Sequence, residues 1–200
     1  MRLDTTEEKI KSAARTIFMK KGYAATKTRD IADHAGINLA LVNYYFRSKE
    51  KLFHEIMMES MQGFFSNIVK VIFDETTSLE HKLEQMASGY IDMFISQPNM
   101  PIFVLSELQS NPEKFVDEMA NRTQIKHSVF FKQLLEKAGI DHIHMINPAH
   151  IFINFMGLMV FPFVAKPMLM SVTELDQEHF NQLMQERKKL IPMWIMNMLE

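Results

Sequence analysis

The chain has 200 residues, of which 47% are hydrophobic and 23% charged, and it contains no cysteine. This composition is typical of a folded globular chain, and the lack of cysteine excludes disulfides, thiol catalysis and thiolate metal sites. The net charge of −2 hides an asymmetry, because residues 1–50 carry +4 and residues 51–200 carry −6. A basic N-terminal segment followed by an acidic remainder is expected of a chain in which only the N-terminal part binds a polyanion.

The first half of the chain predicts four helices separated by tight turns. Residues 6–20 place apolar side chains on one helical face, with a capping box at Thr5 and Glu8 and an end at Gly22. A short helix is expected over 27–34 and a third over 39–46, capped by Asn38. A long fourth helix is expected to follow Ser48 and to run over 49–72. All seven prolines lie at or beyond Pro98, so the first half is free of helix breakers.

Three residues at fixed spacing indicate a helix-turn-helix. Two closely crossing helices need a small residue where they touch, a turn residue that tolerates positive φ, and an apolar residue on the second helix facing the first. Ala32, Gly36 and Val42 meet these demands. The residues expected to complete the small core are Ile17, Phe18, Ile31, Ile37 and Tyr45, and Phe46 is expected in the core as well.

The wider segment resembles the DNA-binding domain of the TetR family of regulators. The resemblance covers roughly residues 6–55, about a quarter of the chain. It rests on Gly22-Tyr23, on Asp30-Ile31-Ala32 with Ala35-Gly36, and on Tyr44-Tyr45-Phe46 followed by Ser48-Lys49-Glu50-Lys51-Leu52. One departure is Asn43, which stands where the family often has an aromatic residue. The resemblance implies an all-α chain with a three-helix DNA-binding domain over 1–50, linked by the helix 49–72 to a helical effector-binding and dimerisation domain over 75–200.

The resemblance also implies which residues meet DNA. Helix 39–46 is expected to lie in the major groove, where an amide such as that of Asn43 can bond a base edge in two places. The predicted base readers are Asn38, Leu39, Ala40, Asn43 and Tyr44. The predicted phosphate contacts are Thr26, Lys27, Thr28, Tyr45 and Lys49. Thr26 and Asn38 are predicted to be helix caps first and DNA contacts second, and Lys49 has the plain alternative of a solvated lysine.

Residues 75–200 read as helices broken by loops at 97–101, 111–112, 139–141 and 166–171. An uncharged helix is expected over 148–164 and a last helix over 174–198. Both carry more apolar surface than a small isolated domain needs, so a homodimer interface is expected there, with Trp194 and Ile195 in it. The resemblance implies the same arrangement, a final helix pair that packs against its twin as a four-helix bundle.

Methionine is unusually frequent, and nine of the eighteen lie at or beyond Met145 among many phenylalanines. Thioethers and aromatic rings suit a pocket that adapts to an apolar or planar ligand, although ordinary core and interface packing is the better explanation of any single one of them. The predicted ligand-binding set is Met86, Tyr90, Met93, Phe94, Phe103, His127, Phe130, Phe152, Phe155, Met156 and Met159.

Other site chemistries find little support. Asp141, His142, His144 and His150 lack the i, i+4 spacing of a helical metal site, so neither a metal nor a cofactor is predicted. The segment 142–165 has no formal charge and the length of a membrane span, but its histidines, asparagines and prolines argue against one. No Ser/His/Asp or phosphate-loop motif indicates an enzyme. With no apolar leader at the N-terminus, the expected location is the cytoplasm.

The sequence therefore predicts a homodimeric transcription regulator, and a repressor in the family's commoner mode. It is expected to bind a palindromic double-stranded operator and to leave it when a small apolar or aromatic effector binds the C-terminal domain. Two alternatives remain open: a DNA-binding adaptor of the same fold controlled by a protein partner, and a domain that has lost DNA binding.

Overall fold

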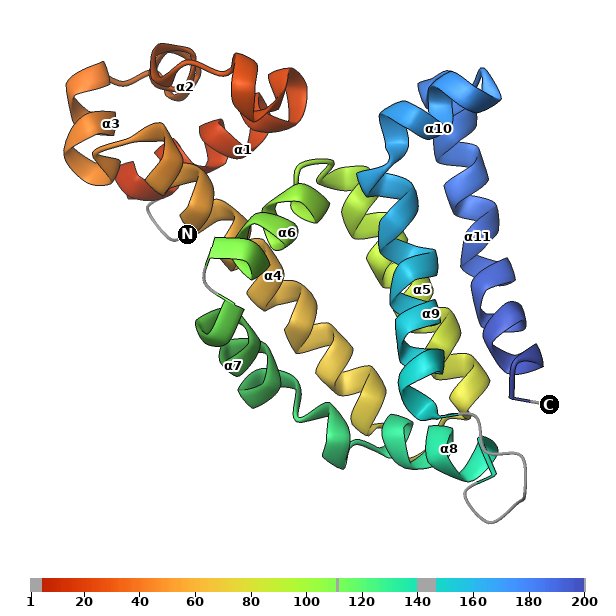
Figure 1. The fold of residues 1–200 in the computed structure, drawn as a ribbon. Helices are drawn as coiled ribbons and strands as arrows, with labels where there is room; N and C mark the ends of the chain where they lie inside the picture. The colour runs from red at the N-terminus through yellow and green to blue at the C-terminus, as the bar shows by residue number, and fades with distance from the viewer. Residues whose placement is uncertain (1–4, 111, 140–146, 200) are drawn as a thin grey trace. The chain divides into compact units, whose positions relative to one another are not determined.

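The structure is a computed structural model that describes residues 5–110, 112–139 and 147–199. All regular elements in these ranges are helices (Figure 1), and the chain divides into two compact units, residues 1–63 and 64–200. The division falls inside α4, the long helix Lys49–Phe73 that the sequence analysis treats as a link.

The N-terminal unit holds α1 (Thr6–Ala25), α2 (Thr28–Ala35), α3 (Leu39–Phe46) and the first part of α4. Thr5 caps α1 by accepting the N–H of Glu8, and the positive φ of 75° at Gly22 kinks α1 before its last three residues. Ser48 accepts the N–H of Lys51 at the start of α4. These caps confirm the predicted helix starts. The side chains that form the core are Ile10, Ala14, Ile17, Phe18, Ile31, Ala32, Val42, Phe46, Leu52 and Ile56.

The C-terminal unit continues from Phe64 with the rest of α4. Its further elements are α5 (Leu79–Ser96), α6 (Met100–Ser110), α7 (Pro112–Thr123), the short 3₁₀ helix η1 (Ile125–His127), α8 (Val129–Lys137), α9 (Pro148–Val164), α10 (Lys166–Thr173) and α11 (Gln177–Asn197). Helix α5 lies at the centre of the core and packs along α11, with α6, α8 and α9 against its other sides. Its buried face therefore borders most of this unit.

A polar cluster fixes the start of α5. Lys82 is fully buried, and its Nζ donates to the carbonyl oxygen and the hydroxyl of Thr77 at 2.6 and 3.0 Å. Gln133 of α8 donates to the same carbonyl at 3.0 Å. The cluster joins the α4–α5 connection to α8, so the buried ammonium serves the fold.

The predicted loop over 166–171 is wrong, because these residues form α10. Pro167 stands in the first turn of that helix, where its missing N–H costs no hydrogen bond, and Met168, Leu169 and Met170 are good helix formers. The last helix begins at Gln177 rather than at 174, with Asp176 as its N-cap. The predicted helix 148–164 is confirmed by α9, capped by Asn147.

Candidate DNA-binding and ligand-binding sites

The turn between α2 and α3 is built as the sequence predicts. Gly36 has a left-handed φ of 66°, and the N–H of Ile37 returns to the carbonyl of Ala32 at 3.1 Å, which closes α2. Asn38 then caps α3 by accepting the N–H of Ala40 at 2.8 Å. Ala32 and Val42 are both buried where the two helices meet. The two helices are therefore held in a fixed crossing, and the opposite side of α3 is left open.

The open side of α3 carries the predicted base readers. Tyr44 is 78% exposed, and Asn43 and Ala40 are exposed beside it. Leu39 is half-buried, and Asn38 is exposed with its side chain engaged as the cap. Phe46 is buried as expected. Helix α3 thus offers an aromatic ring and an amide to any partner that approaches from solvent.

Tyr45 differs from the expectation that it completes the small core. It is 42% exposed, and its ring stands edge-on to Tyr44 with the centroids 5.4 Å apart. The core position of Tyr45 is therefore wrong, because Val42 and Phe46 already fill the inner face of α3. Its exposure agrees with the other predicted role, a phosphate contact, which stays a prediction.

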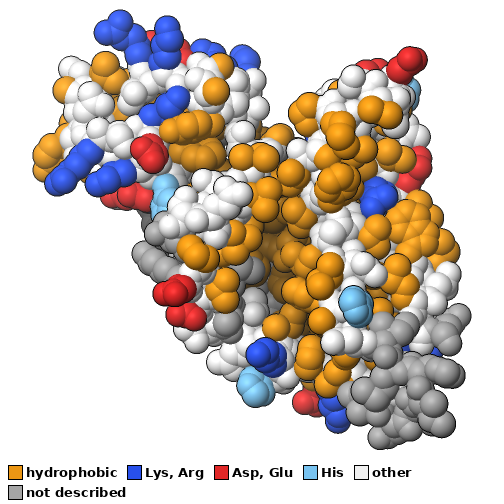
Figure 2. Space-filling view, in the orientation of Figure 1, with side chains coloured by type: hydrophobic (Ala, Val, Ile, Leu, Met, Phe, Trp, Pro, Cys, Tyr) orange, Lys and Arg blue, Asp and Glu red, His pale blue; other side chains and the backbone are white. Residues whose placement is uncertain are grey.

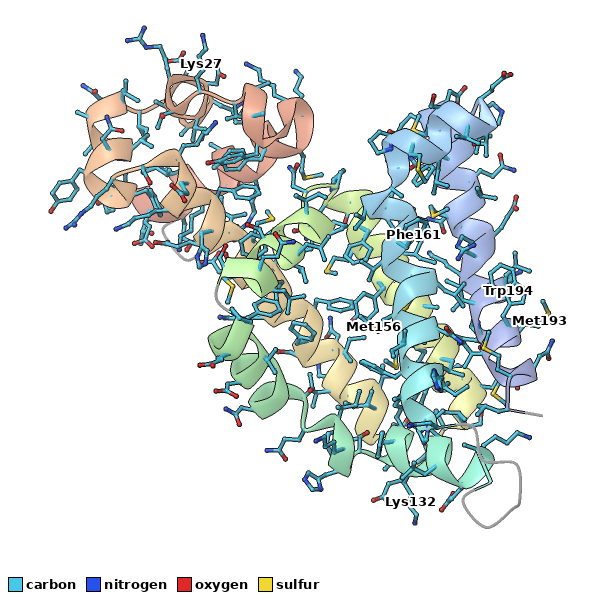
Figure 3. The ribbon with its side chains drawn as sticks, in the orientation of Figure 1. Lys27, Lys132, Met156, Phe161, Met193 and Trp194 are labelled. Atoms are coloured by element: carbon cyan, nitrogen blue, oxygen red, sulfur yellow. The ribbon has the colours of Figure 1, made fainter. Side chains whose placement is uncertain are left out.

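The predicted phosphate contacts at the start of α2 and α4 fall into two groups. Thr26 is buried, and its hydroxyl donates to the carbonyl of Gly22 at 2.7 Å. Lys49 donates to the carbonyls of Tyr23 and Thr26, both at 2.9 Å, and its ammonium lies 4.3 Å from the centroid of the Tyr23 ring. In contrast, Lys27 is exposed and Thr28 is half-exposed at the first turn of α2 (Figure 3). The first pair holds the end of α1 against α4, while the second pair faces solvent.

The surface of the N-terminal unit is rich in exposed lysine and arginine. Figure 2 shows these side chains gathered along the edge of this unit. Beyond the predicted set, the exposed cations on α1, α2 and the α3–α4 turn are Lys20, Lys21, Arg29 and Arg47. In the sequence these cations are visible only as net charge, because their common placement depends on how the three helices pack.

An ion-pair network between α1 and α4 was missed at the sequence level. Lys11 is almost fully buried, and its Nζ lies 2.7 Å from Glu59, 3.1 Å from Glu7 and 3.5 Å from Glu55. Arg15 also bonds Glu59. Burial lowers the pKa of Lys11, but the hydrogen bonds to Glu59 and Glu7 outweigh it and leave that pKa above its ordinary value. The i, i+4 repeat of Lys11 with Arg15 and of Glu55 with Glu59 was the available signal.

The predicted ligand set centres on α5 and α9. Aromatic rings form a continuous row from Phe64 of α4 through Tyr90 and Phe94 of α5 to Phe163 of α9 and Phe180 of α11, with neighbouring centroids 4.5, 5.9, 5.1 and 5.9 Å apart. The buried members of the predicted set are Met86, Tyr90, Phe94, Phe103, Phe130, Phe155 and Met159. Met93 and Met156 are partly exposed and Phe152 is 43% exposed.

The C-terminal unit is hollowed on the face seen in Figure 2. Hydrophobic side chains line this hollow, between the surface over α6 and α7 on one side and over α9 on the other. Met156 lies on the side of α9 that borders it (Figure 3). An apolar concave surface of this kind is typical of small-molecule sites.

His127 lies with a different set of residues. It lines an open cavity of about 430 Å³ together with Asn121, Gln124, Ile125 and Lys126, at the end of α7 and in η1. Four of these five lining residues are polar or charged, whereas the other members of the predicted ligand set are apolar or aromatic.

A second apolar surface lies on the outer sides of the last three helices. Its exposed side chains are Ile153, Phe161, Met168, Val172, Leu183 and Met193. Trp194 is partly exposed, with the guanidinium of Arg187 5.2 Å from its ring, and both Met193 and Trp194 stand on the outer side of α11 (Figure 3). Ile195 is fully buried inside the unit, so placing it in a dimer interface is wrong.

Two further features of the sequence are the candidate metal cluster and the uncharged segment of membrane-spanning length. Within the described residues, no group of three metal-ligating side chains comes together; His150 is exposed, and Asp141, His142 and His144 lie outside those residues. No single helix of the described ranges is long and apolar enough to span a membrane, although α9 and α10, bent by 75°, pass that test as a pair.

Comparison with known proteins identifies the class. Residues 10–56 match the family model "Bacterial regulatory proteins, tetR family". The probable HTH-type transcriptional regulator YttP of Bacillus subtilis is 22% identical over 193 residues, 96% of this chain and 92% of that one. The HTH-type transcriptional repressor KstR2 of Mycolicibacterium smegmatis is 32% identical over 73 residues, 36% of each chain.

Solved structures agree with this class in fold. A TetR/AcrR family regulator from Thermobifida fusca superposes with a TM-score of 0.62 at 18% identity, over 93% of this chain and 96% of that one. The FadR regulator of Bacillus subtilis, solved in complex with stearoyl-CoA, gives a TM-score of 0.58 at 18% identity, over 92% and 96%. The helix-turn-helix and the family match together indicate a DNA-binding transcriptional regulator, and residues 10–56 carry the DNA-binding domain that the tetR family model describes.

Proposed function

We propose that the chain is a homodimeric repressor that binds a palindromic operator through α3 and leaves it when a small apolar or aromatic ligand binds the C-terminal unit. The observation that carries the proposal is the open side of α3, where Asn43 and Tyr44 stand exposed on a helix fixed by the Gly36 turn and the Asn38 cap. A helix presented in this way fits the major groove.

The proposed DNA contacts divide by chemistry. Asn43 reads a base edge with its amide, and Leu39 or Ala40 packs on a thymine methyl. Tyr44 and Tyr45 flank the groove, while Lys27 and Thr28 meet phosphate at the N-terminus of α2. Thr26 and Lys49 support this surface chiefly from within, because their polar atoms are engaged with Gly22, Tyr23 and Thr26.

Dimerisation follows from the outer apolar surface of α9, α10 and α11. Exposed apolar patches of this kind on a soluble protein mark interaction surfaces, and a two-fold pair covers the same patch on both copies. Two copies then present two α3 helices to half-sites about 34–36 Å apart, one turn of DNA.

Ligand control passes through α4 in this proposal. Glu55 and Glu59 tie the first part of α4 to α1, and Phe64 contacts Tyr90 in the C-terminal unit. A ligand in the hollow that moves the far part of α4 therefore moves the helix that begins at the DNA-binding unit. The complex of FadR with stearoyl-CoA, whose acyl chain is long and apolar, supports a ligand of apolar character.

The test is a gel-shift titration of the purified protein on the DNA upstream of its own gene, at two salt concentrations. Specific binding with a steep salt dependence and a two-fold footprint supports the proposal. If neither that DNA nor a random-sequence selection yields a bound site, the proposed operator binding is refuted. If a site is bound and no small molecule releases it, control by a protein partner replaces the ligand.

A further inference from the structure

Tyr90 occupies a central place in the aromatic row. Its ring contacts Phe64 at 4.5 Å and Phe94 at 5.9 Å between centroids, both edge-on, so it joins α4 to α5. The next ring in the row, Phe163, belongs to α9, whose side chains border the apolar hollow. Tyr90 is therefore the one ring of this row that carries a hydroxyl, since the other four are phenylalanines.

The hydroxyl of Tyr90 stands apart from other buried polar groups of the chain. Lys82 bonds Thr77, and Ser128 donates to the carbonyl of Ile125 at 2.6 Å, but no residue that the structure describes hydrogen-bonds the Tyr90 hydroxyl. A buried tyrosine normally finds a partner for its O–H, since losing one to burial is costly. A phenol without a partner among the described residues is thus a position where a ligand can supply the acceptor.

Tyr90 is not completely enclosed. Its ring is covered by Phe64 and Phe94, and 8% of the residue remains exposed.

Electrostatics restricts what this hydroxyl can bind. Burial raises the pKa of Tyr90 to about 12, and no neighbouring charge among the described residues contributes to that shift. The group is therefore a neutral donor at any physiological pH. Because none of the described side chains places a cation beside it, an anionic ligand group would be desolvated there without compensation from them, whereas an uncharged acceptor would not need it.

We propose that Tyr90 is the polar recognition residue of the ligand site, with its hydroxyl donating a hydrogen bond to an uncharged acceptor, such as a ketone, ester or thioester carbonyl, on an otherwise apolar ligand. This inference rests on the proposed ligand-responsive function and names the ligand class for it. An apolar site with one or few placed polar groups uses the apolar lining for affinity and the polar group for specificity.

The experiment compares two fluorescent probes on the full-length protein and on Tyr90→Phe. Nile red is uncharged and carries a carbonyl acceptor, and diphenylhexatriene is a hydrocarbon without one. We expect Tyr90→Phe to bind Nile red about five- to tenfold more weakly, with blue-shifted emission, because the buried carbonyl loses its donor. Its affinity for diphenylhexatriene should stay within about twofold, since phenylalanine keeps the ring contacts with Phe64 and Phe94.

A matched control is Tyr23→Phe, which removes a phenolic hydroxyl from the N-terminal unit and should leave both dye affinities unchanged. A second measurement needs no variant: displacement of diphenylhexatriene from the wild-type protein by methyl laurate, by laurate and by tridecane. The uncharged ester should displace the dye at the lowest concentration of the three.

The outcomes separate the inference from the function on which it rests. If both dyes bind the wild-type protein and Tyr90→Phe binds Nile red with unchanged affinity and emission, or if laurate displaces better than its ester, Tyr90 is not the recognition residue and the ligand site still stands. If the wild-type protein binds neither dye, the apolar ligand site itself is refuted, and the inference with it.

Discussion

Two lysines of the N-terminal unit illustrate how the fold assigns different roles to like residues. The ammonium of Lys49 is held by two carbonyls and by the ring of Tyr23, so it stabilises the domain before it meets anything else. Lys27 is exposed at the N-terminus of α2, where backbone N–H groups already favour an anion. Of the two, Lys27 is therefore free to add a phosphate contact without disturbing the packing.

Replacing Lys27 with alanine should weaken DNA binding equally on all sequences. One lost phosphate contact lowers the slope of log affinity against log salt by about 1, because one fewer counterion is released. Fluorescence anisotropy on operator and non-operator DNA across salt concentrations measures this. The control is Lys132→Ala in α8, an equally exposed lysine of the C-terminal unit (Figure 3). Equal slopes for Lys27→Ala and Lys132→Ala would remove Lys27 from the interface.

Asp30 makes the stability of the N-terminal unit depend on acid. Its carboxylate accepts the N–H of Lys27 at 3.0 Å and lies 3.1 Å from the ammonium of Lys21, and these contacts hold the pKa of Asp30 below its ordinary value of 3.8. A lowered pKa means that the stabilisation is present above the unfolded pKa and is lost as pH falls through the folded one. We expect the melting temperature of Asp30→Asn to fall below that of the wild type at pH 6 and to approach it as the pH falls through the lowered pKa of Asp30. If the melting temperatures of the variant and the wild type differ by the same amount at every pH, this assignment is contradicted.

At the scale of helices, the ion pairs of Lys11 hold α1 against the start of α4. One ammonium faces three carboxylates, and among the described residues only Glu59 has a second cation, Arg15. Removing the ammonium leaves like charges crowded on adjoining helices, and like-charge crowding favours separation of the two.

We expect Lys11→Met to lower the free energy of unfolding by about 1–3 kcal/mol, less than for a fully buried pair because the carboxylates are about 40–50% exposed. Urea titration followed by circular dichroism measures it. Lys9→Met, an exposed lysine on the same helix, should leave the transition where it is. A common midpoint for the two variants would show that the network contributes nothing.

Helix α11 has an inner and an outer face, and the outer one is the proposed dimer surface. Leu183 is 41% exposed on it, while Phe180 and Met184 beside it are buried. Leu183→Glu should therefore convert the dimer to monomer at micromolar concentration, because a two-fold interface buries the introduced charge twice. Light scattering after gel filtration measures the mass. Gln185→Glu, two residues on and turned about 200° around the helix, is the control and should remain dimeric. A dimer in both variants would place the interface elsewhere.

The N-terminal helices were predictable because their signals are local. Asn38, Gly36 and Thr5 each act within four residues of their own position, so the sequence alone places the caps and the turn. The wrong predictions concern contacts between elements. Tyr45 was expected in a core that Phe46 already fills. Ile195 was expected in the dimer interface, although it is fully buried on the inner face of α11. The loop at 166–171 was expected around Pro167, which instead stands in the first turn of α10. The unpaired hydroxyl of Tyr90 and the Lys11 network likewise exist only once helices are packed.

At the scale of the whole molecule, the proposed repressor is a linkage between two sites. A ligand that binds the hollow can release DNA only if it binds the DNA-free arrangement more tightly than the DNA-bound one. The helix α4 is the covalent route for this coupling, since its two parts belong to the two compact units. Typical coupling of about 1–3 kcal/mol corresponds to a five- to 150-fold change in affinity.

Linkage makes the effect reciprocal, which gives a test that does not depend on knowing the natural ligand. If Nile red at saturation weakens operator binding by some factor, saturating operator DNA must weaken Nile red binding by the same factor. We expect both factors to lie between about five and 150, measured by anisotropy of labelled operator and by Nile red fluorescence on one protein preparation. Non-operator DNA of equal length, at a concentration that leaves the protein unbound, serves as the control. If Nile red binds with unchanged affinity whether or not operator is present, the hollow binds apolar molecules without controlling DNA, and the effector must act elsewhere on the chain.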